Sequence, residues 1–253
     1  VVMACIAFLV LIGGIERIGK VTQVVVPLMA TLYIIGALAI LFIRFDQIPT
    51  AFGIIFSDAF SGKAAAGGVL GVVIQKGIER GFFSNEAGLG SGSIAHAAAK
   101  TTDAVRQGTV AMIGTFIDTI VICTMTALVI VITGAYTSGL SNVDLAINAF
   151  DQGLPAGSLL VTFATIFFTA TTILGWGYYS ERCLEFLVGT GSIKFFRLTW
   201  VAVVVFGAVA APEAIWTIAA ILNGLMAIPN LIGLLLLSGI VFKLTKNYSF
   251  EVD

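Results

Sequence analysis

The sequence predicts an all-α integral membrane protein, and three observations lead to that prediction. Apolar residues make up 58% of the 253 residues, charged residues make up 11%, and the mean hydropathy is +1.06, whereas a soluble domain carries about 25% charged residues. Several apolar stretches reach the roughly 20 residues with which a helix crosses a bilayer. The weak alternation over about ten residues that is typical of outer-membrane strands is missing.

Seven apolar segments follow one another along the chain, and each is predicted to be helical. They span residues 1–12, 21–43, a broken stretch 64–99, 108–133, 157–178, 195–211 and 214–242. The first is too short to cross a bilayer, and we interpret it as the end of a truncated helix because the chain opens inside an apolar run. We therefore expect one transmembrane domain over residues 1–253, a fragment of about seven helices that lacks its N-terminal helices.

The basic residues predict an orientation. One side of the predicted bundle carries nine of them, namely Arg17, Lys20, Lys100, Arg106, Arg182, Lys194, Arg197, Lys243 and Lys246, whereas the opposite side has only Arg44 and Lys63 at its edges. Because cytoplasmic connections are enriched in Lys and Arg, we expect a multi-pass protein of the cell membrane with a cytoplasmic C-terminus. Membrane lipid is then a partner, and the net charge of −1 argues against nucleic acid.

A polar, glycine-rich run, GFFSNEAGLGSGSIAH at 81–96, interrupts the apolar stretch 64–99. The bilayer core offers no water to free backbone groups, so uncoiled chain there must be buried in protein or line a watery cavity. We predict a membrane segment that is broken around residues 84–90, preceded by an interfacial or re-entrant helix up to about Gln75, although an earlier start of the span is an alternative.

The break can be interpreted in two ways. An unwound helix exposes carbonyl groups that can hold Na⁺ or an ammonium group, and N–H groups that can face a carboxylate. Glu86 at bilayer depth costs a few kcal/mol unless it is paired, which favours a functional role for Asn85 and Glu86. The alternative is a glycine-rich helix that packs closely on a neighbour, which we favour for Gly90 and Gly92.

A second polar group lies in the run TATTILGWGYY at 169–179. Thr172 and Trp176 are four residues apart and therefore share one helical face, where a hydroxyl above an indole would form a small amphipathic pocket wall. The oxygens of Thr171 and Thr172 could complete a cation shell, although threonine often bonds the carbonyl four residues earlier. The polar residues that follow are interpreted as an interface anchor with a local ion pair, namely Tyr178, Tyr179, Glu181 and Arg182.

Three further polar residues lie inside apolar segments. Asp118 is expected to face the bundle interior and to pair with a donor, either as a functional acid or as a brace between helices. Asn223 and Asn230 are interpreted as interhelical hydrogen-bonding groups, and Pro229 beside them predicts a kink. No nucleophile–base pair, phosphate loop or metal-ligand cluster occurs in the sequence, so we predict neither an enzyme nor a metal site.

Together these motifs resemble the alanine/glycine:cation symporter family, the sodium:alanine symporters of the amino acid–polyamine–cation superfamily. The resemblance rests on the run 81–100, on GTFID at 114–118, on TTILGW and YYSER within 171–182, and on NGLMAIPN at 223–230. It implies the leucine-transporter-type fold of two inverted five-helix repeats, with 64–99 as the broken sixth helix and 157–178 as the eighth. The chain would then hold only the C-terminal part, the end of repeat one and all of repeat two. Where relatives often carry Ala-Pro, it has Gly92-Ser93.

The resemblance also implies a function, which is sodium-coupled symport of a small neutral amino acid, alanine or glycine. Na⁺ would be the coupling ion, and no other cofactor is expected. The implied substrate-binding residues are Phe83, Ser84, Asn85, Glu86, Gly88, Thr172 and Trp176. Sodium would bind at Thr171 or Thr172, and Glu86 or Asp118 would be the acid of a proton-coupled alternative. A channel or a non-transporting subunit is a further alternative, and the oligomeric state is not predicted.

Overall fold

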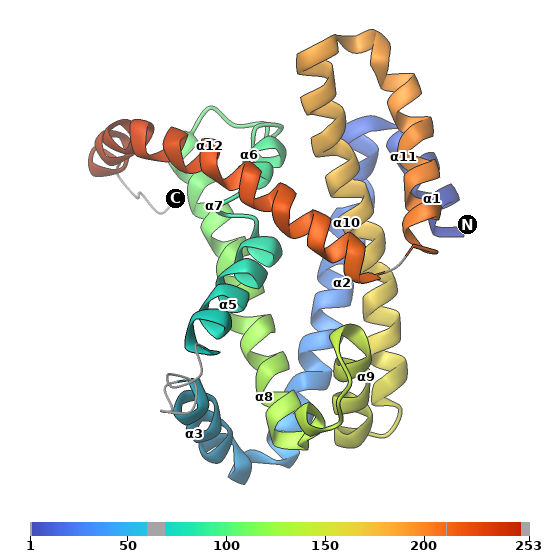
Figure 1. Cartoon of the computed structure of the whole chain (residues 1–253). Coiled ribbons are helices and arrows are strands. Elements are labelled where there is room, and N and C mark those ends of the chain that lie inside the picture. Colours follow the sequence, from blue (N-terminus) through green and yellow to red (C-terminus); the bar gives the residue numbers. More distant parts are fainter. Residues whose placement is uncertain (1, 60–68, 211, 249–253) are drawn as a thin grey trace.

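The structure is a computed structural model that describes residues 2–59, 69–210 and 212–248, and no strand occurs in these three ranges (Figure 1). The α-helices are α1 (Val2–Leu11), α2 (Gly14–Ile43), α3 (Ile48–Ala59), α5 (Val69–Asn85), α6 (Ser91–His96), α7 (Ala104–Thr115), α8 (Thr124–Thr133), α9 (Asn142–Gly153), α10 (Gly157–Val188), α11 (Ile193–Gly207) and α12 (Pro212–Lys246). Short 3-10 turns are η1 (Phe45–Gln47), η3 (Ala135–Thr137) and η4 (Thr190–Ser192), and η2 (Phe116–Cys123) is a π-helix. The all-α prediction is confirmed.

Within the described ranges, five helical stretches are long and apolar enough to cross a membrane. They are Gly14–Ile43, Ala104–Thr133, Gly157–Val188, Thr190–Gly207 and Ala214–Lys246. Two of the seven predicted segments are not among them, because α1 has only ten residues and the stretch 64–99 is divided between α5 and α6. Residues 64–68 and Lys63 lie outside the described part of the chain. The five spans support a multi-pass membrane protein.

The ends of several helices follow from local chemistry. Asp103 caps α7, since its carboxylate accepts the backbone N–H of Arg106 at 2.9 Å, as helix N-caps commonly do. Gly134 ends α8 in the left-handed conformation, with φ of 74°, which glycine adopts without steric cost. Pro229 lies inside α12, and the helix continues through it, so the predicted kink does not interrupt the span.

The larger hydrophobic core lies where α2, α8, α9 and α10 meet, toward the lower end of the bundle in Figure 1. Ile40, Val129 and Phe150 are fully buried there. The hydroxyl groups of Tyr33 and Thr126 share a hydrogen bond of 2.7 Å between α2 and α8. The short helix α9, which the apolar segments did not predict, supplies Phe150 and so closes this end of the core.

A smaller core joins α1 and the start of α2 to α10, and an ion-pair cluster adjoins it. Glu181 of α10 is only 2% exposed, and its carboxylate accepts from Arg197 of α11 at 2.6 and 2.9 Å and from Arg182 at 2.8 Å. Arg197 also donates to the carbonyl of Ile12 at 3.2 Å. The predicted local pair between Glu181 and Arg182 is confirmed, but Arg197, the partner that ties three helices together, was not predicted.

Candidate functional site

The polar run at 81–96 is uncoiled in its middle. Helix α5 ends at Asn85 and α6 begins at Ser91, so residues 86–90 are not helical. Glu86 and Gly90 both have positive φ, 56° and 83°, a region that residues other than glycine rarely enter. The predicted break is confirmed, although Ser84 and Asn85 still belong to the last turn of α5. A glutamate in this conformation is a feature typical of functional sites.

The break leaves backbone carbonyl groups without helical partners. The Glu86 N–H still bonds the Phe82 carbonyl at 3.2 Å, but the Leu89 N–H turns to Glu86 at 3.1 Å. In the described part of the chain no donor reaches the carbonyls of Phe83, Ser84 and Asn85. These are the oxygen dipoles that an uncoiled membrane helix can offer to a cation or an ammonium group.

The last turn of α5 is held by the π-helix η2. Ser84 Oγ donates to Asp118 Oδ2 at 2.7 Å, and Asn85 Nδ2 donates to Thr119 Oγ1 at 3.1 Å. The Asn85 amide oxygen in turn accepts the N–H of Ala87 at 3.0 Å, which anchors the start of the uncoiled residues. The prediction that Asp118 pairs with a donor is confirmed, and its use as a coupling acid stays a prediction. π-Helical turns occur frequently at functional sites.

The Glu86 carboxylate points toward α6 and α10. Ser91 Oγ donates to Glu86 Oε2 at 2.9 Å, and the side chains of Trp176 and Tyr179 lie near the carboxylate without hydrogen-bonding it. Tyr179, interpreted from the sequence as an interface anchor, instead faces the site. The carboxylate therefore has one bonded donor, Ser91, with the polar ends of two aromatic side chains near it.

Aromatic side chains from three helices meet beside the break. Phe83 of α5 and Trp176 of α10 have ring centroids 6.4 Å apart and planes inclined by 19°. Tyr179 meets Trp176 edge-on at 6.0 Å, and Trp216 of α12 lies 5.4 Å from Phe83. The predicted pair of Phe83 and Trp176 is thus brought together. Such a wall is apolar in its body and carries N–H and O–H groups at its edges.

The threonines behave differently from each other. Thr171 donates its hydroxyl to the carbonyls of Phe167 and Phe168 at 3.0 and 3.1 Å, within its own helix. Thr172 lies one turn before Trp176 on α10, is exposed, and has no hydrogen-bond partner among the described residues. Both hydroxyl oxygens retain lone pairs for a cation, so sodium binding at these residues stays a prediction.

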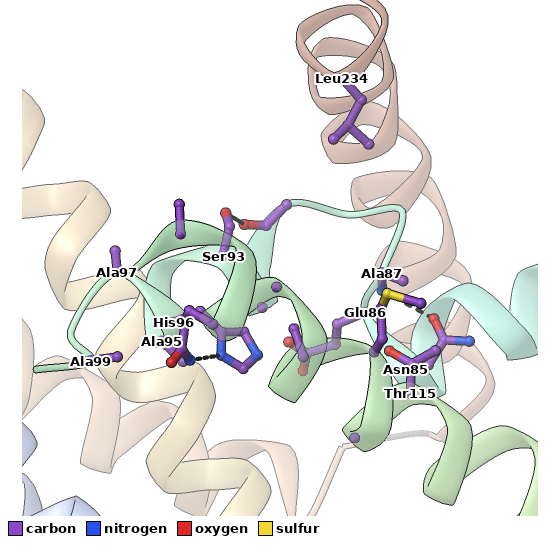
Figure 2. Close-up of a pocket in the computed structure, with 18 of the residues that line it drawn as sticks. Asn85, Glu86, Ala87, Ser93, Ala95, His96, Ala97, Ala99, Thr115 and Leu234 are labelled. Carbon is purple, nitrogen blue, oxygen red and sulfur yellow. Dashed lines mark hydrogen bonds between the residues drawn. The ribbon is translucent and has the colours of Figure 1, made fainter. Parts of the chain in front are cut away.

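A cavity of about 1130 Å³ opens from the break toward the connection between α6 and α7. Asn85, Glu86, Tyr179 and Asn230 line it, and most of its remaining wall comes from α6, α7 and the connection between these two helices. Figure 2 shows Glu86, His96 and Thr115 around this space, with Leu234 of α12 projecting from above. Phe83, Thr172 and Trp176 do not line it, whereas Tyr179, which belongs to the aromatic wall, does.

The glycines of the break also bear on the packing alternative. A Cβ at Gly88 would lie 2.6 Å from the Phe82 ring, and one at Gly90 would lie 2.8 Å from Asn230 Oδ1. A Cβ at Gly92 would have no neighbouring atom within 4 Å. Close packing therefore explains the glycines at 88 and 90. Of the two glycines for which the sequence predicted close packing, the prediction is confirmed for Gly90 and not for Gly92.

Comparison with known proteins assigns the chain. The sequence model of the sodium:alanine symporter family matches residues 1–252. The chain belongs to this family. It is 48% identical over 98% of its length to the sodium/alanine symporter AgcS of Methanococcus maripaludis, and 32% identical over 99% to a sodium/proton-dependent alanine carrier protein of Bacillus sp. (strain PS3). It is also 37% identical over 95% to the probable sodium/glutamine symporter GlnT of Bacillus subtilis.

The chain spans little more than half the length of these relatives of the sodium:alanine symporter family, with 56%, 61% and 51% of each covered. The resemblance noted in the sequence is confirmed. The names of the family and of these relatives describe transporters, which points to transport and not to enzyme catalysis.

Sequence reasoning missed several residues at the site of this sodium:alanine symporter family member. Ser91, Thr119 and Trp216 all contact predicted site residues. One signal was present for Trp216, since it precedes Asn223 and Asn230 by seven and fourteen residues and thus shares their face of α12. Ser91 and Thr119 gave no such signal, because small hydroxyl residues are common in membrane helices.

Proposed function

We propose that this chain, within a protein of its relatives' length, carries out sodium-coupled symport of a small neutral amino acid such as alanine or glycine. The observation that carries the proposal is the uncoiled segment 86–90, with open carbonyls at the end of α5 beside the stacked rings of Phe83 and Trp176. A relative named as a sodium/alanine symporter, 48% identical, supports the choice of ion and substrate.

The substrate would bind by its charged ends and by its size. Its ammonium group would meet the carbonyls of residues 83–85 and the Glu86 carboxylate, with the Thr172 hydroxyl on the facing helix. Phe83 and Trp176 would bound the space for the side chain, in which one methylene is worth about 1–3 kcal/mol. Na⁺ would bind at Thr171 or Thr172 together with backbone carbonyls, and no covalent chemistry is needed.

The arrangement in the membrane belongs to the same proposal. The broken α5–α6 segment would be the sixth helix, and α10 the eighth, of a leucine-transporter-type inverted repeat. Arg17, Arg182 and Arg197 would lie on the cytoplasmic side together with the C-terminus. An inside-negative potential of 100 mV supplies about 2.3 kcal/mol per Na⁺, enough to concentrate a neutral substrate about 50-fold.

Replacement of Na⁺ by choline at constant pH is expected to abolish uptake of labelled alanine by the full-length protein, because the ion gradient supplies the driving energy. Uptake would be measured in proteoliposomes with a fixed membrane potential, and empty liposomes serve as the control. Uptake that continues undiminished in choline would reject sodium coupling.

Proton coupling is the second candidate, favoured by the Asp118 carboxylate bonded to Ser84 and by a relative named as sodium/proton-dependent. In the choline arm, a transmembrane pH gradient imposed without Na⁺ separates the two. Uptake driven by the pH gradient alone supports protons, and uptake only with Na⁺ supports the proposal. Saturable exchange of labelled alanine against internal unlabelled alanine would exclude a channel.

Trp176→Ala is expected to admit larger amino acids, because it removes the ring that stacks on Phe83 at the proposed side-chain space. Inhibition of alanine uptake by glutamine, the substrate in the name of one relative, should strengthen about tenfold or more, because glutamine is longer than alanine by a methylene and a carboxamide and one methylene alone corresponds to about 1–3 kcal/mol. Trp200→Ala, a change of tryptophan on α11 away from the break, is the control. Unchanged glutamine inhibition would contradict the pocket assignment.

A further inference from the structure

Helix α12 contacts the broken segment and its surroundings at three places along its length. Near its start, Trp216 lies against Phe83, and the Arg80 guanidinium stands 4.3 Å from the centre of the Trp216 ring. In its middle, Asn230 reaches the uncoiled residues, and just after its end Tyr248 reaches the cap of α7. In Figure 1, α12 crosses the molecule obliquely from the end of α11 to the side of α6 and α7.

The central contact is a hydrogen bond to the uncoiled backbone. Asn230 Nδ2 donates to the carbonyl oxygen of Gly88 at 3.0 Å, and no other donor reaches this oxygen in the described part of the chain. The Asn230 amide oxygen lies against Gly90, where a Cβ would come within 2.8 Å. Gly90 also has a φ of 83°, so the Asn230 side chain packs against the uncoiled conformation of the backbone.

The same face of α12 makes the first contact as well. Trp216, Asn223 and Asn230 follow one another at intervals of seven residues, and seven residues complete two turns with a drift of only about 20°. The face that carries Asn230 onto Gly88 therefore also carries Trp216 onto Phe83. α12 thus lies along the broken segment with one continuous face.

The third contact closes the far end. The Tyr248 hydroxyl donates to Asp103 Oδ2 at 2.8 Å. The backbone N–H of Arg106 and then this hydroxyl lower the pKa of Asp103, so its carboxylate is ionised and able to accept at neutral pH. No described side chain of residues 214–246 is buried, so α12 is held on the site by individual contacts and not by a packed core.

From these contacts we propose that Asn230 is a positioning residue for the transport site, and that it acts by keeping residues 86–90 uncoiled. In a continuous helix the Gly88 carbonyl would accept the N–H of Gly92, and an unsatisfied carbonyl is costly at membrane depth. The Asn230 side chain donates to the Gly88 carbonyl, so this carbonyl is satisfied although the chain is not helical there. It thereby favours the conformation in which the carbonyls of residues 83–85 and Glu86 face the substrate. The inference rests on the proposed transport function.

Asn230→Leu, which keeps the size and removes the donor, is expected to raise the KM for alanine about five-fold while Vmax per molecule at the surface is unchanged. The loss of one hydrogen bond lowers the fraction of binding-competent protein by about this factor, and the apparent affinity falls with that fraction. Ser238→Ala is the matched control, since Ser238 is exposed on the same helix and donates only to the Leu235 carbonyl. A KM equal to that of the wild type would overturn the proposal.

A second variant tests the donor itself. Asn230→Asp keeps the shape, donates to Gly88 only while its carboxyl is protonated, and repels that carbonyl once ionised. Its KM relative to the wild type should therefore approach one at acid pH and rise several-fold above neutral pH, where a purely structural role predicts a constant ratio. The wild type is measured at each pH because other titratable groups line the same cavity, namely Glu86, His96, Asp103 and Tyr179.

Amide hydrogen exchange provides a measurement that does not depend on transport. In purified full-length protein, Asn230→Leu should slow the hydrogen-exchange rate of amides 86–92 by about five-fold, because the uncoiled conformation is less populated. Ser238→Ala should leave this rate unchanged. If the wild type fails to carry alanine while this exchange changes as expected, the proposed function is wrong and the positioning of the break by Asn230 stands. Exchange that is the same in Asn230→Leu and the wild type would refute the positioning role.

Discussion

Exchange of Glu86 for glutamine is expected to lower the initial rate of alanine uptake by about 100-fold. The carboxylate accepts from Ser91 at 2.9 Å and lines the cavity together with Tyr179, and a hydrogen bond to a charged group is worth about 1.5–3 kcal/mol. The neutral amide of glutamine accepts a weaker hydrogen bond from Ser91, and its NH2 group is a donor where the glutamate has only acceptor oxygens. A loss of about 3 kcal/mol corresponds to roughly 100-fold in rate, measured as labelled alanine uptake per molecule at the surface.

The backbone of Glu86 must be separated from its charge in this experiment. Because the φ of Glu86 is 56°, a substitution at this position can also change the energetic cost of the left-handed backbone conformation. Glu86→Gly relieves that cost and should still be inactive, whereas Glu86→Gln leaves it in place. Glu16→Gln, at an exposed glutamate in the first turn of α2, is the control. Uptake by Glu86→Gln within about two-fold of the wild type would contradict a role for the charge.

The position of the break could be predicted because its cause is local. Glycine and polar residues between 81 and 96 make a lipid-facing helix unfavourable wherever they occur, so the sequence located residues 84–90 within a residue or two of the uncoiled 86–90. The spacing of Thr172 and Trp176 likewise placed them on one helix. Local chemistry of this kind needs no knowledge of which helices are neighbours.

The partners across the break could not be predicted, because they depend on how each helix is rotated about its axis. Asp118 was expected to find a donor, but only packing shows that the donor is Ser84, 34 residues away. Tyr179 follows Tyr178 directly, yet Tyr178 is buried in the smaller core, whereas Tyr179 only packs against that core and lines the cavity with Glu86. A difference of one residue, about 100° around a helix, separates a structural tyrosine from one at the site.

The length of α10 was underestimated for a related reason. The predicted segment ended at residue 178, because the charged residues that follow it are typical of an interface, whereas the helix continues to Val188. Glu181 can be buried inside the bundle since two arginines surround it. A charged residue after an apolar run therefore does not by itself mark the end of a helix, and pairing between α10 and α11 is a property of the fold.

That buried pair leads to the largest expected effect on stability. Glu181→Leu should lower the free energy of unfolding by about 3–5 kcal/mol, because it leaves the mostly buried Arg197 side chain, 18% exposed, without its counter-charge. Glu181 is 2% exposed and joins α10 to α11, while Arg197 reaches back to Ile12 at the end of α1. In detergent, the purified full-length protein should unfold about 4 °C lower than the wild type, as followed by loss of the folded peak in size-exclusion chromatography after heating.

Two further variants identify the stranded charge as the cause. Glu185→Gln removes a carboxylate that pairs with Arg182 at a partly exposed position, so it should cost less than about 1 kcal/mol. Glu181→Leu combined with Arg197→Met replaces both charges by apolar side chains of similar size, an exchange that is often neutral or stabilising. The double variant should therefore recover most of the decrease in unfolding temperature that Glu181→Leu causes. If it is no more stable than Glu181→Leu alone, the cost comes from lost hydrogen bonds to α1 and α11 and not from an unpaired charge.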